Sequence, residues 1–164
     1  MKKRIPMLLL LAAPYAMLGS AALAFAGRRA WLALLAWGLA FLLVFLPNMV
    51  YAFMLPRMGY TQRQLLFWNM LLKLCNIPFY VLVFLMGMMM SVFVIPLLPI
   101  LILVDYTVLL PSTMYGVSGL LKARKARGIS KKVLIVNGIM QFTFCLDVCS
   151  AVYLYVSSRR GNNE

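Results

Sequence analysis

Long apolar stretches without charged side chains dominate the hydrophobic pattern of the chain. They cover residues 7–26, 30–56 and 74–104. An α-helix needs about 20 mostly apolar residues to cross roughly 30 Å of hydrocarbon, so each stretch is long enough to span a bilayer. None of them shows the strict alternation of polar and apolar positions that marks a strand of a membrane barrel. The pattern therefore predicts an all-α integral membrane protein.

Helix breakers divide these stretches into about five expected helices. From residue 74 to residue 121 only Asp105 is charged, and a single helix of this length would measure about 72 Å, more than twice the hydrocarbon thickness. The segment must fold back, and Pro96 and Pro99 mark the expected turn. We expect one multi-pass membrane domain over residues 1–164, without a soluble domain. Its helices are expected at about 7–26, 30–55, 65–94, 97–121 and 133–156, with a basic cytoplasmic loop at 122–132.

Local turn and cap signals support these boundaries. Gly27 separates the first two helices, which we expect to form an antiparallel hairpin. Residues 56–59 are typical of a turn, and Thr61 can cap the helix that follows. Gly128 and Ser130 can end one helix and cap the next.

The first helix could instead be a secretory signal peptide. Lys2, Lys3 and Arg4 precede its apolar run, and the small residues around Ala26 resemble a cleavage site. The run of 20 residues exceeds the 7–15 of a typical signal sequence, so a retained helix is favoured. Cleavage would leave four helices in the membrane.

The basic residues are arranged as a topology signal. Net charge is +13, but nearly all Lys and Arg lie between or beside the apolar runs, so nucleic-acid binding is not needed to explain them. With five spans, the sides of the membrane receive eleven and four of these residues, which places the N-terminus in the cytoplasm and the C-terminus outside. The compact basic loops suit a bacterial plasma membrane.

Few residue types that support catalysis or metal binding are present. The chain has no His and only three acids, and it contains no nucleotide-binding loop or nucleophile constellation. Cys145 and Cys149 lie four positions apart on one expected helix, where a disulfide would be strained. We therefore expect neither an enzyme nor a cofactor or metal site.

Asp105 and Asp147 are the acids that require an explanation, because an ionised side chain inside a membrane helix costs at least about 2.5–3.5 kcal/mol. They lie about 12 and 13 Å from the outer ends of their expected helices. If they face each other, they form a cation or proton site with Thr143 as a neutral ligand. In the alternative, each Asp is protonated, or is bonded to a hydroxyl such as that of Thr107, and fastens helices together.

A polar stripe on the third expected helix contains Asn69, Lys73 and Asn76. We expect it to be a partly exposed helix start, from which Lys73 reaches the headgroups, too far from the aspartates to pair with them. The alternative is the wall of a polar cavity or an anion contact.

Two further groups are assigned to packing and to lipid contact. Ser112 and Gly116 lie one helical turn apart and form a small face that permits close helix approach. The loop cations can contact anionic headgroups. They are Lys122, Arg124, Lys125, Arg127, Lys131 and Lys132.

Two function classes remain. The first is a non-catalytic membrane component, an accessory or regulatory subunit that acts through helix contacts with a membrane protein partner or with further copies of the chain. The second is a small cation- or proton-coupled transporter or channel-like protein that uses the intramembrane aspartates.

Overall fold

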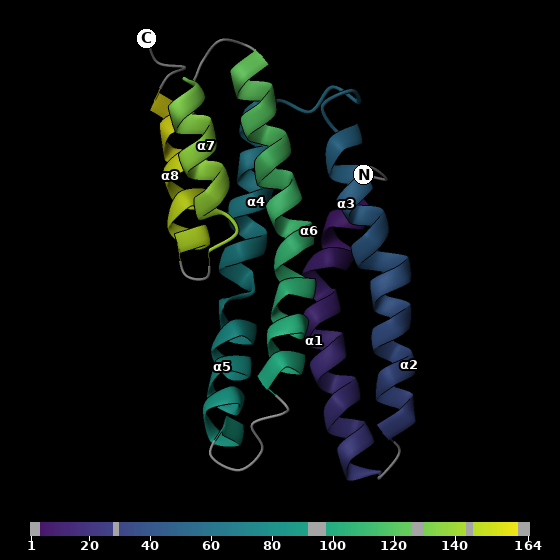
Figure 1. Cartoon of the computed structure of the whole chain (residues 1–164). Coiled ribbons are helices and arrows are strands. Elements are labelled where there is room, and N and C mark those ends of the chain that lie inside the picture. Colours follow the sequence, from purple (N-terminus) through teal and green to yellow (C-terminus); the bar gives the residue numbers. More distant parts are fainter. Residues whose placement is uncertain (1–3, 28–29, 92–97, 126–129, 144–145, 161–164) are drawn as a thin grey trace. The chain divides into compact units, whose positions relative to one another are not determined.

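The computed structural model describes residues 4–27, 30–91, 98–125, 130–143 and 146–160, and this part of the chain contains helices and no strand (Figure 1). The all-helical prediction is confirmed. The helices are α1 (Ile5–Ala26), α2 (Ala30–Ala40), the π-helical η2 (Phe41–Phe45), α3 (Leu46–Met54), α4 (Gln62–Cys75), α5 (Ile77–Ser91), α6 (Leu98–Lys125), α7 (Lys131–Met140) and α8 (Leu146–Arg160).

Two helical runs within the described ranges are long and apolar enough to cross a membrane. They are Ile5–Leu23 and Trp31–Met54. A third is obtained if α4 and α5 are counted together as one interrupted span. The described residues therefore contain two or three candidate spans by length and composition, and the five-span arrangement stays a prediction.

Internal contacts divide the chain into two compact units. The first comprises Met1–Asn48 and Asn76–Val108, and the second comprises Met49–Cys75 and Leu109–Glu164. Each unit has its own packing.

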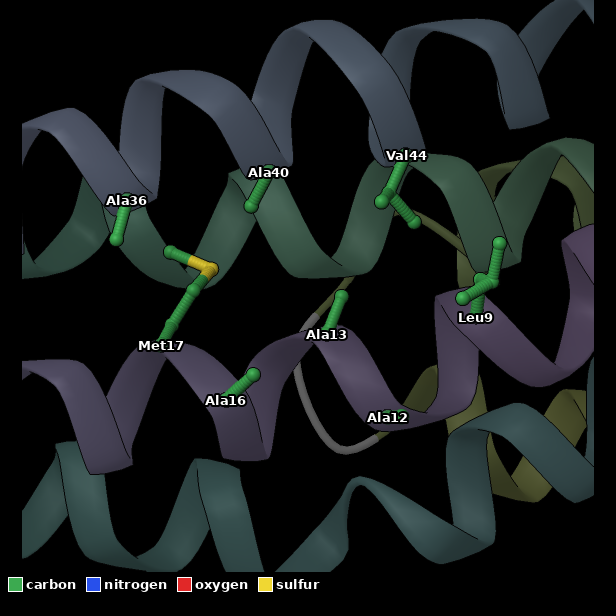
Figure 2. A pocket seen from close by; sticks show the side chains of 8 residues that line it. All are labelled: Leu9, Ala12, Ala13, Ala16, Met17, Ala36, Ala40 and Val44. Atoms are coloured by element: carbon green, nitrogen blue, oxygen red, sulfur yellow. The ribbon is translucent and has the colours of Figure 1, made fainter.

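In the first unit, α1 and α2 form the expected antiparallel hairpin (Figure 1). The indole Nε1 of Trp37 donates a hydrogen bond to the Met17 carbonyl oxygen at 3.2 Å. Small side chains leave an apolar cavity of about 220 Å³ between the helices (Figure 2). Its lining is Leu9, Ala12, Ala13, Ala16, Met17, Ala36, Ala40 and Val44. A lining of this kind favours a hydrophobic group.

The second expected helix is continuous through α2, η2 and α3, with one wide turn. In η2 the backbone N–H of Leu46 bonds to the Phe41 oxygen, the π-helical pattern. Pro47 follows directly and lacks the N–H that a regular helix would use. The Asn48 side-chain amide donates a hydrogen bond to the Val44 carbonyl oxygen at 2.8 Å, and thus adds a donor next to the proline. We attribute the wide turn to this proline.

In the second unit, the turn at residues 56–59 and the cap at Thr61 occur as predicted. Gly59 has a φ of +90°, a conformation that favours glycine. The Thr61 hydroxyl accepts from the Gln64 N–H at 3.3 Å, and the Gln64 side chain accepts from the Thr61 N–H at 3.0 Å. This reciprocal pair is a capping box, which fixes the start of α4.

The helix expected at about 65–94 is interrupted, because α4 and α5 are separated at Asn76. Pro78 gives the physical reason, since it has no N–H to donate to the Leu74 carbonyl and its ring crowds that carbonyl. The expected turn at Pro96 lies outside the described residues.

The prediction of a single helix at about 133–156 is wrong. The antiparallel helices α7 and α8 take its place and lie side by side in Figure 1. The Ser150 hydroxyl of α8 donates to Asn137 Oδ1 of α7 at 3.1 Å. Leu134, one turn before Asn137, packs against a cluster that contains Leu154, one turn after Ser150. The two helices therefore point in opposite directions.

The helix breaks for a tertiary reason that helical periodicity does not reveal. The Gln141 N–H bonds to the carbonyls of Asn137 and Ile139 and closes α7. Apolar periodicity fits one long helix or two short ones equally well. Folding back brings α8 against α4, and α8 buries Asp147, Ser150, Ala151 and Leu154.

Around the predicted basic loop, Ser130 caps α7 as expected, and its hydroxyl accepts from the Val133 N–H at 3.3 Å. The α6 helix extends to Lys125, four residues beyond the predicted end. Gly128 lies outside the described residues.

Close packing of α6 on α4 depends on Gly119. A Cβ at this position would lie 2.9 Å from Leu66 Cδ2 and 3.4 Å from Leu65 Cβ. Leu66 is itself buried in a cluster with Leu120 and Leu154, so it has little room to move.

We predict that Gly119→Ala lowers the free energy of unfolding by about 1–3 kcal/mol, because the added methyl group overpacks this contact. Gly138→Ala is the matched control, since nothing lies within 4 Å of its Cβ position. The control should gain about 0.5–1 kcal/mol from helix propensity. Thermal unfolding in mild detergent measures both, and equal stability of the two variants would contradict the packing.

Candidate buried charge site

A buried ion pair between α4 and α8 is the central polar feature of the second unit. Lys73 Nζ lies 3.3 Å from Asp147 Oδ2, and the two side chains expose 0% and 3% of their surface. Two opposite charges at this depth offset much of the cost of taking each out of water. The pair therefore removes the net charge that either residue alone would place in an apolar interior.

Antiparallel packing of α4 and α8 brings these residues together. The Phe67 and Tyr155 rings lie 5.7 Å apart, and Leu66 shares a cluster with Leu154. Lys73 lies about two turns after Leu66 on α4, and Asp147 lies about two turns before Leu154 on α8. Because the helices are antiparallel, these two positions are opposite each other. Asp147 also lies in the first turn of α8, where the helix dipole favours a negative charge.

The turn after α7 supplies further oxygen atoms. The Gln141 carbonyl accepts from Lys73 Nζ at 3.4 Å and from the Thr113 hydroxyl at 3.0 Å. This carbonyl lies at the C-terminal end of α7, where the last carbonyls of a helix have no partner within the helix. Three segments, α4, α6 and the α7–α8 turn, thus meet at one carbonyl.

Two amide side chains add unused hydrogen-bonding groups. Asn69, one turn before Lys73, and Gln141 are fully buried, and none of their side-chain N and O atoms has a partner within the described part of the chain. Burying such a group unpaired costs about 1–3 kcal/mol. The Gln141 amide lies over Gly116, where a Cβ would come within 2.0 Å of Oε1.

The small face predicted at Ser112 and Gly116 is buried. The Ser112 hydroxyl donates to the Leu109 oxygen of its own helix at 2.8 Å, so this hydrogen bond does not link two helices. Gly116 makes room for the Gln141 side chain rather than for a helix backbone.

The aspartates predicted to act together are placed in different units. Asp147 pairs with Lys73, whereas Asp105 belongs to the first unit and is partly buried, with its Oδ1 atom unpartnered among the described residues. Thr107 donates to the Leu103 oxygen at 2.7 Å, and this bond is not the one suggested for Asp105. The two-carboxylate site stays a prediction.

Thr143 was expected to offer its hydroxyl to a cation. Its side chain is exposed and donates to the Ile139 oxygen at 3.3 Å, while its carbonyl accepts the Asp147 N–H at 3.0 Å. Thr143 therefore contributes to the start of α8.

The expectation of a partly exposed polar stripe is wrong. Asn69, Lys73 and Asn76 expose 1% of their surface or less. The statement that Lys73 is too far from the aspartates is also wrong, because it assumed one straight helix at about 133–156. A usable signal was present, since Lys73 is the one basic residue deep in an apolar segment and its charge needs a partner there.

The predicted lipid-contact residues that the structure describes lie in the last turn of α6 and in the first turn of α7. Arg124, Lys125, Lys131 and Lys132 are exposed. Lys122 instead donates to the Tyr60 carbonyl, which ties α6 to the turn before α4. Arg127 lies outside the described residues.

We predict a strong coupling between the paired residues. Lys73→Met or Asp147→Leu alone should lower the free energy of unfolding by about 3–5 kcal/mol, because each leaves an unpaired buried charge. The double variant should be near wild-type stability, since it leaves no charge behind. Thermal unfolding in detergent measures the cycle, and additive losses would contradict direct pairing.

Comparison with known proteins gives a family without an assigned activity. No curated protein and no solved structure shows significant similarity to the chain. Among the described residues there is no group of three or more His, Cys, Asp or Glu side chains that could hold a metal ion. The family model that matches residues 4–160 covers nearly the whole chain, and the protein therefore belongs to a family of unknown function, DUF6652.

Proposed function

We propose that this chain is a multi-pass membrane protein that acts as a non-catalytic component of a membrane assembly. The observation that carries the proposal is the apolar surface of the helical run Trp31–Met54. In the most apolar part of this run, only 11% of the residues are buried within the protein. Leu34 and Leu43 each expose 69% of their surface. Such a surface requires lipid or another apolar helix to cover it.

In this proposal α1, the α2–α3 run, the α4–α5 pair and α6 are inserted in the bilayer. The C-terminal hairpin enters and leaves on the same side. At 1.5 Å per residue α7 and α8 measure about 15 and 22 Å, less than the roughly 30 Å of hydrocarbon. The Gln141 carbonyl, at the end of α7, accepts hydrogen bonds from Lys73 and Thr113, and such protein contacts permit irregular backbone at membrane depth.

This hairpin changes the proposed orientation of the C-terminus. The earlier placement outside depended on a fifth span, whereas α8 returns to the side on which α7 begins. Thirteen of the sixteen basic residues then lie on the cytoplasmic side, while Arg28 and Arg29 lie outside and Lys73 is in the core. The exposed cations at the ends of α6 and α7 can contact anionic headgroups there.

We predict that a reporter fused after Glu164 is located in the cytoplasm. Fusions of alkaline phosphatase and of green fluorescent protein at this position should give low phosphatase activity and high fluorescence in cells. A fusion at Gly59 provides the cytoplasmic reference, because it lies in the turn before α4. High phosphatase activity at Glu164 would restore the five-span arrangement.

A second candidate function is cation- or proton-coupled transport. Intramembrane ion pairs and unpartnered buried amides occur on solute and proton pathways, and Lys73, Asp147, Asn69 and Gln141 show this combination. Because Lys73 already neutralises Asp147, the pair equally supports a structural role. We therefore place transport second.

A photo-crosslinking experiment distinguishes the two candidates. We predict that a diazirine analogue of Phe at position 43 gives one discrete protein adduct in native membranes. The same analogue at position 45 is the matched control, since Phe45 is buried in the same π-helical segment and should give none. If positions 34 and 43 label only lipid, the protein partner is absent and the transport hypothesis takes its place.

A further inference from the structure

We propose that the second unit contains a binding site for a primary ammonium group, and that the Lys73 side chain is its resident ligand. The site is built from one oxygen atom of α8 and one of the turn after α7. Asp147 Oδ2 and the Gln141 carbonyl oxygen lie 3.3 and 3.4 Å from Lys73 Nζ. The inference holds whether or not a protein partner is found, because it concerns only the interior of this unit.

The geometry differs from that of a tight ion pair. Charge-assisted N–H···O bonds usually measure about 2.7–2.9 Å, and both contacts of Lys73 Nζ are longer. An ammonium group carries three donors, so two acceptors do not exhaust it. The ammonium is shared between a carboxylate and a carbonyl, as a bound cation is shared among its ligands.

Unused acceptors are present on Gln141 itself and on the residue one turn before Lys73. Asn69 Oδ1, on the same face of α4 one turn before Lys73, and Gln141 Oε1 are buried without a hydrogen-bond partner among the described residues. An ion pair alone needs neither of them. A site for a cation with several N–H donors uses such oxygens, because each can accept one hydrogen bond.

The turn geometry also fits a cation site. Backbone carbonyls at an interruption or at the C-terminal end of a helix are frequent cation ligands inside membrane proteins. The Gln141 carbonyl is in this position at the end of α7, and the Thr113 hydroxyl already donates to it at 3.0 Å. The side chain of Lys73 fills the place of a soluble cation, so the wild-type protein needs none from solution.

Shortening the side chain of residue 73 should convert the site into one that binds a free ammonium ligand. In Lys73→Ala the oxygens remain and the ammonium is lost. We predict that ethylammonium chloride raises the Tm of this variant in a saturable manner, as expected for a ligand that binds the folded state. Tetramethylammonium chloride at the same concentration should leave the Tm unchanged, because this cation has no N–H group to donate a hydrogen bond.

Three matched variants separate the site from general effects. Lys73→Met keeps a long side chain in the same place and should not respond to ethylammonium. Lys73→Ala combined with Asp147→Asn lacks the carboxylate and should not respond either. Lys131→Ala removes an exposed cation of the same unit and should behave like the wild type.

Each outcome decides the proposal. A saturable response confined to Lys73→Ala with ethylammonium supports it. Equal stabilisation by tetramethylammonium, or an equal response of Lys73→Met, overturns it, because charge screening or surface binding would then explain the effect. If Lys73→Ala does not fold alone, it is purified in ethylammonium and exchanged into tetramethylammonium, and retention of the folded state after exchange overturns the proposal.

Discussion

The structure of the second unit depends on the requirement that a buried charge has a partner. Lys73 lies about 16 Å along α4 from Gln62, beyond easy reach of the helix start. Its ammonium group contacts Asp147 and the Gln141 carbonyl, which belong to the C-terminal hairpin. Because removing either charge leaves the other buried and unpaired, the ion pair favours the folded-back arrangement of α7 and α8 over a single extended helix.

Interruptions of regular helix recur where the chain carries proline or polar residues. Pro47 follows the π-helical segment, and Pro78 follows the break at Asn76. In each case a missing N–H releases a backbone carbonyl from the helical pattern. The turn at Gln141 has no proline, yet its carbonyl accepts two side-chain donors from other segments. This third interruption is stabilised by tertiary hydrogen bonds, which distinguishes it from the two that proline explains.

The polar groups of the second unit combine a stabilising role with a capacity for binding. The ion pair joins α4 to α8, Thr113 joins α6 to the turn, and Gly116 makes room for the Gln141 amide. Unpartnered amide atoms beside this network are costly, so they suggest that the interior serves more than packing. In the first unit, by contrast, small side chains around an apolar cavity and exposed leucines favour contact with hydrophobic partners. The division supports a component that meets its surroundings through apolar helices and holds the Lys73–Asp147 pair inside its second unit.

The sequence by itself determined the helical class, the first two helices, the turn at residues 56–59 and the caps at Thr61 and Ser130. These features are local, since they follow from runs of apolar residues, from glycine and from side chains that bond to nearby backbone. Only the tertiary structure decided that residues 133–156 form a hairpin and that Lys73 meets Asp147. Helical periodicity is the same for one helix as for two antiparallel ones, and the partner of a buried charge is chosen by contacts between segments more than seventy residues apart.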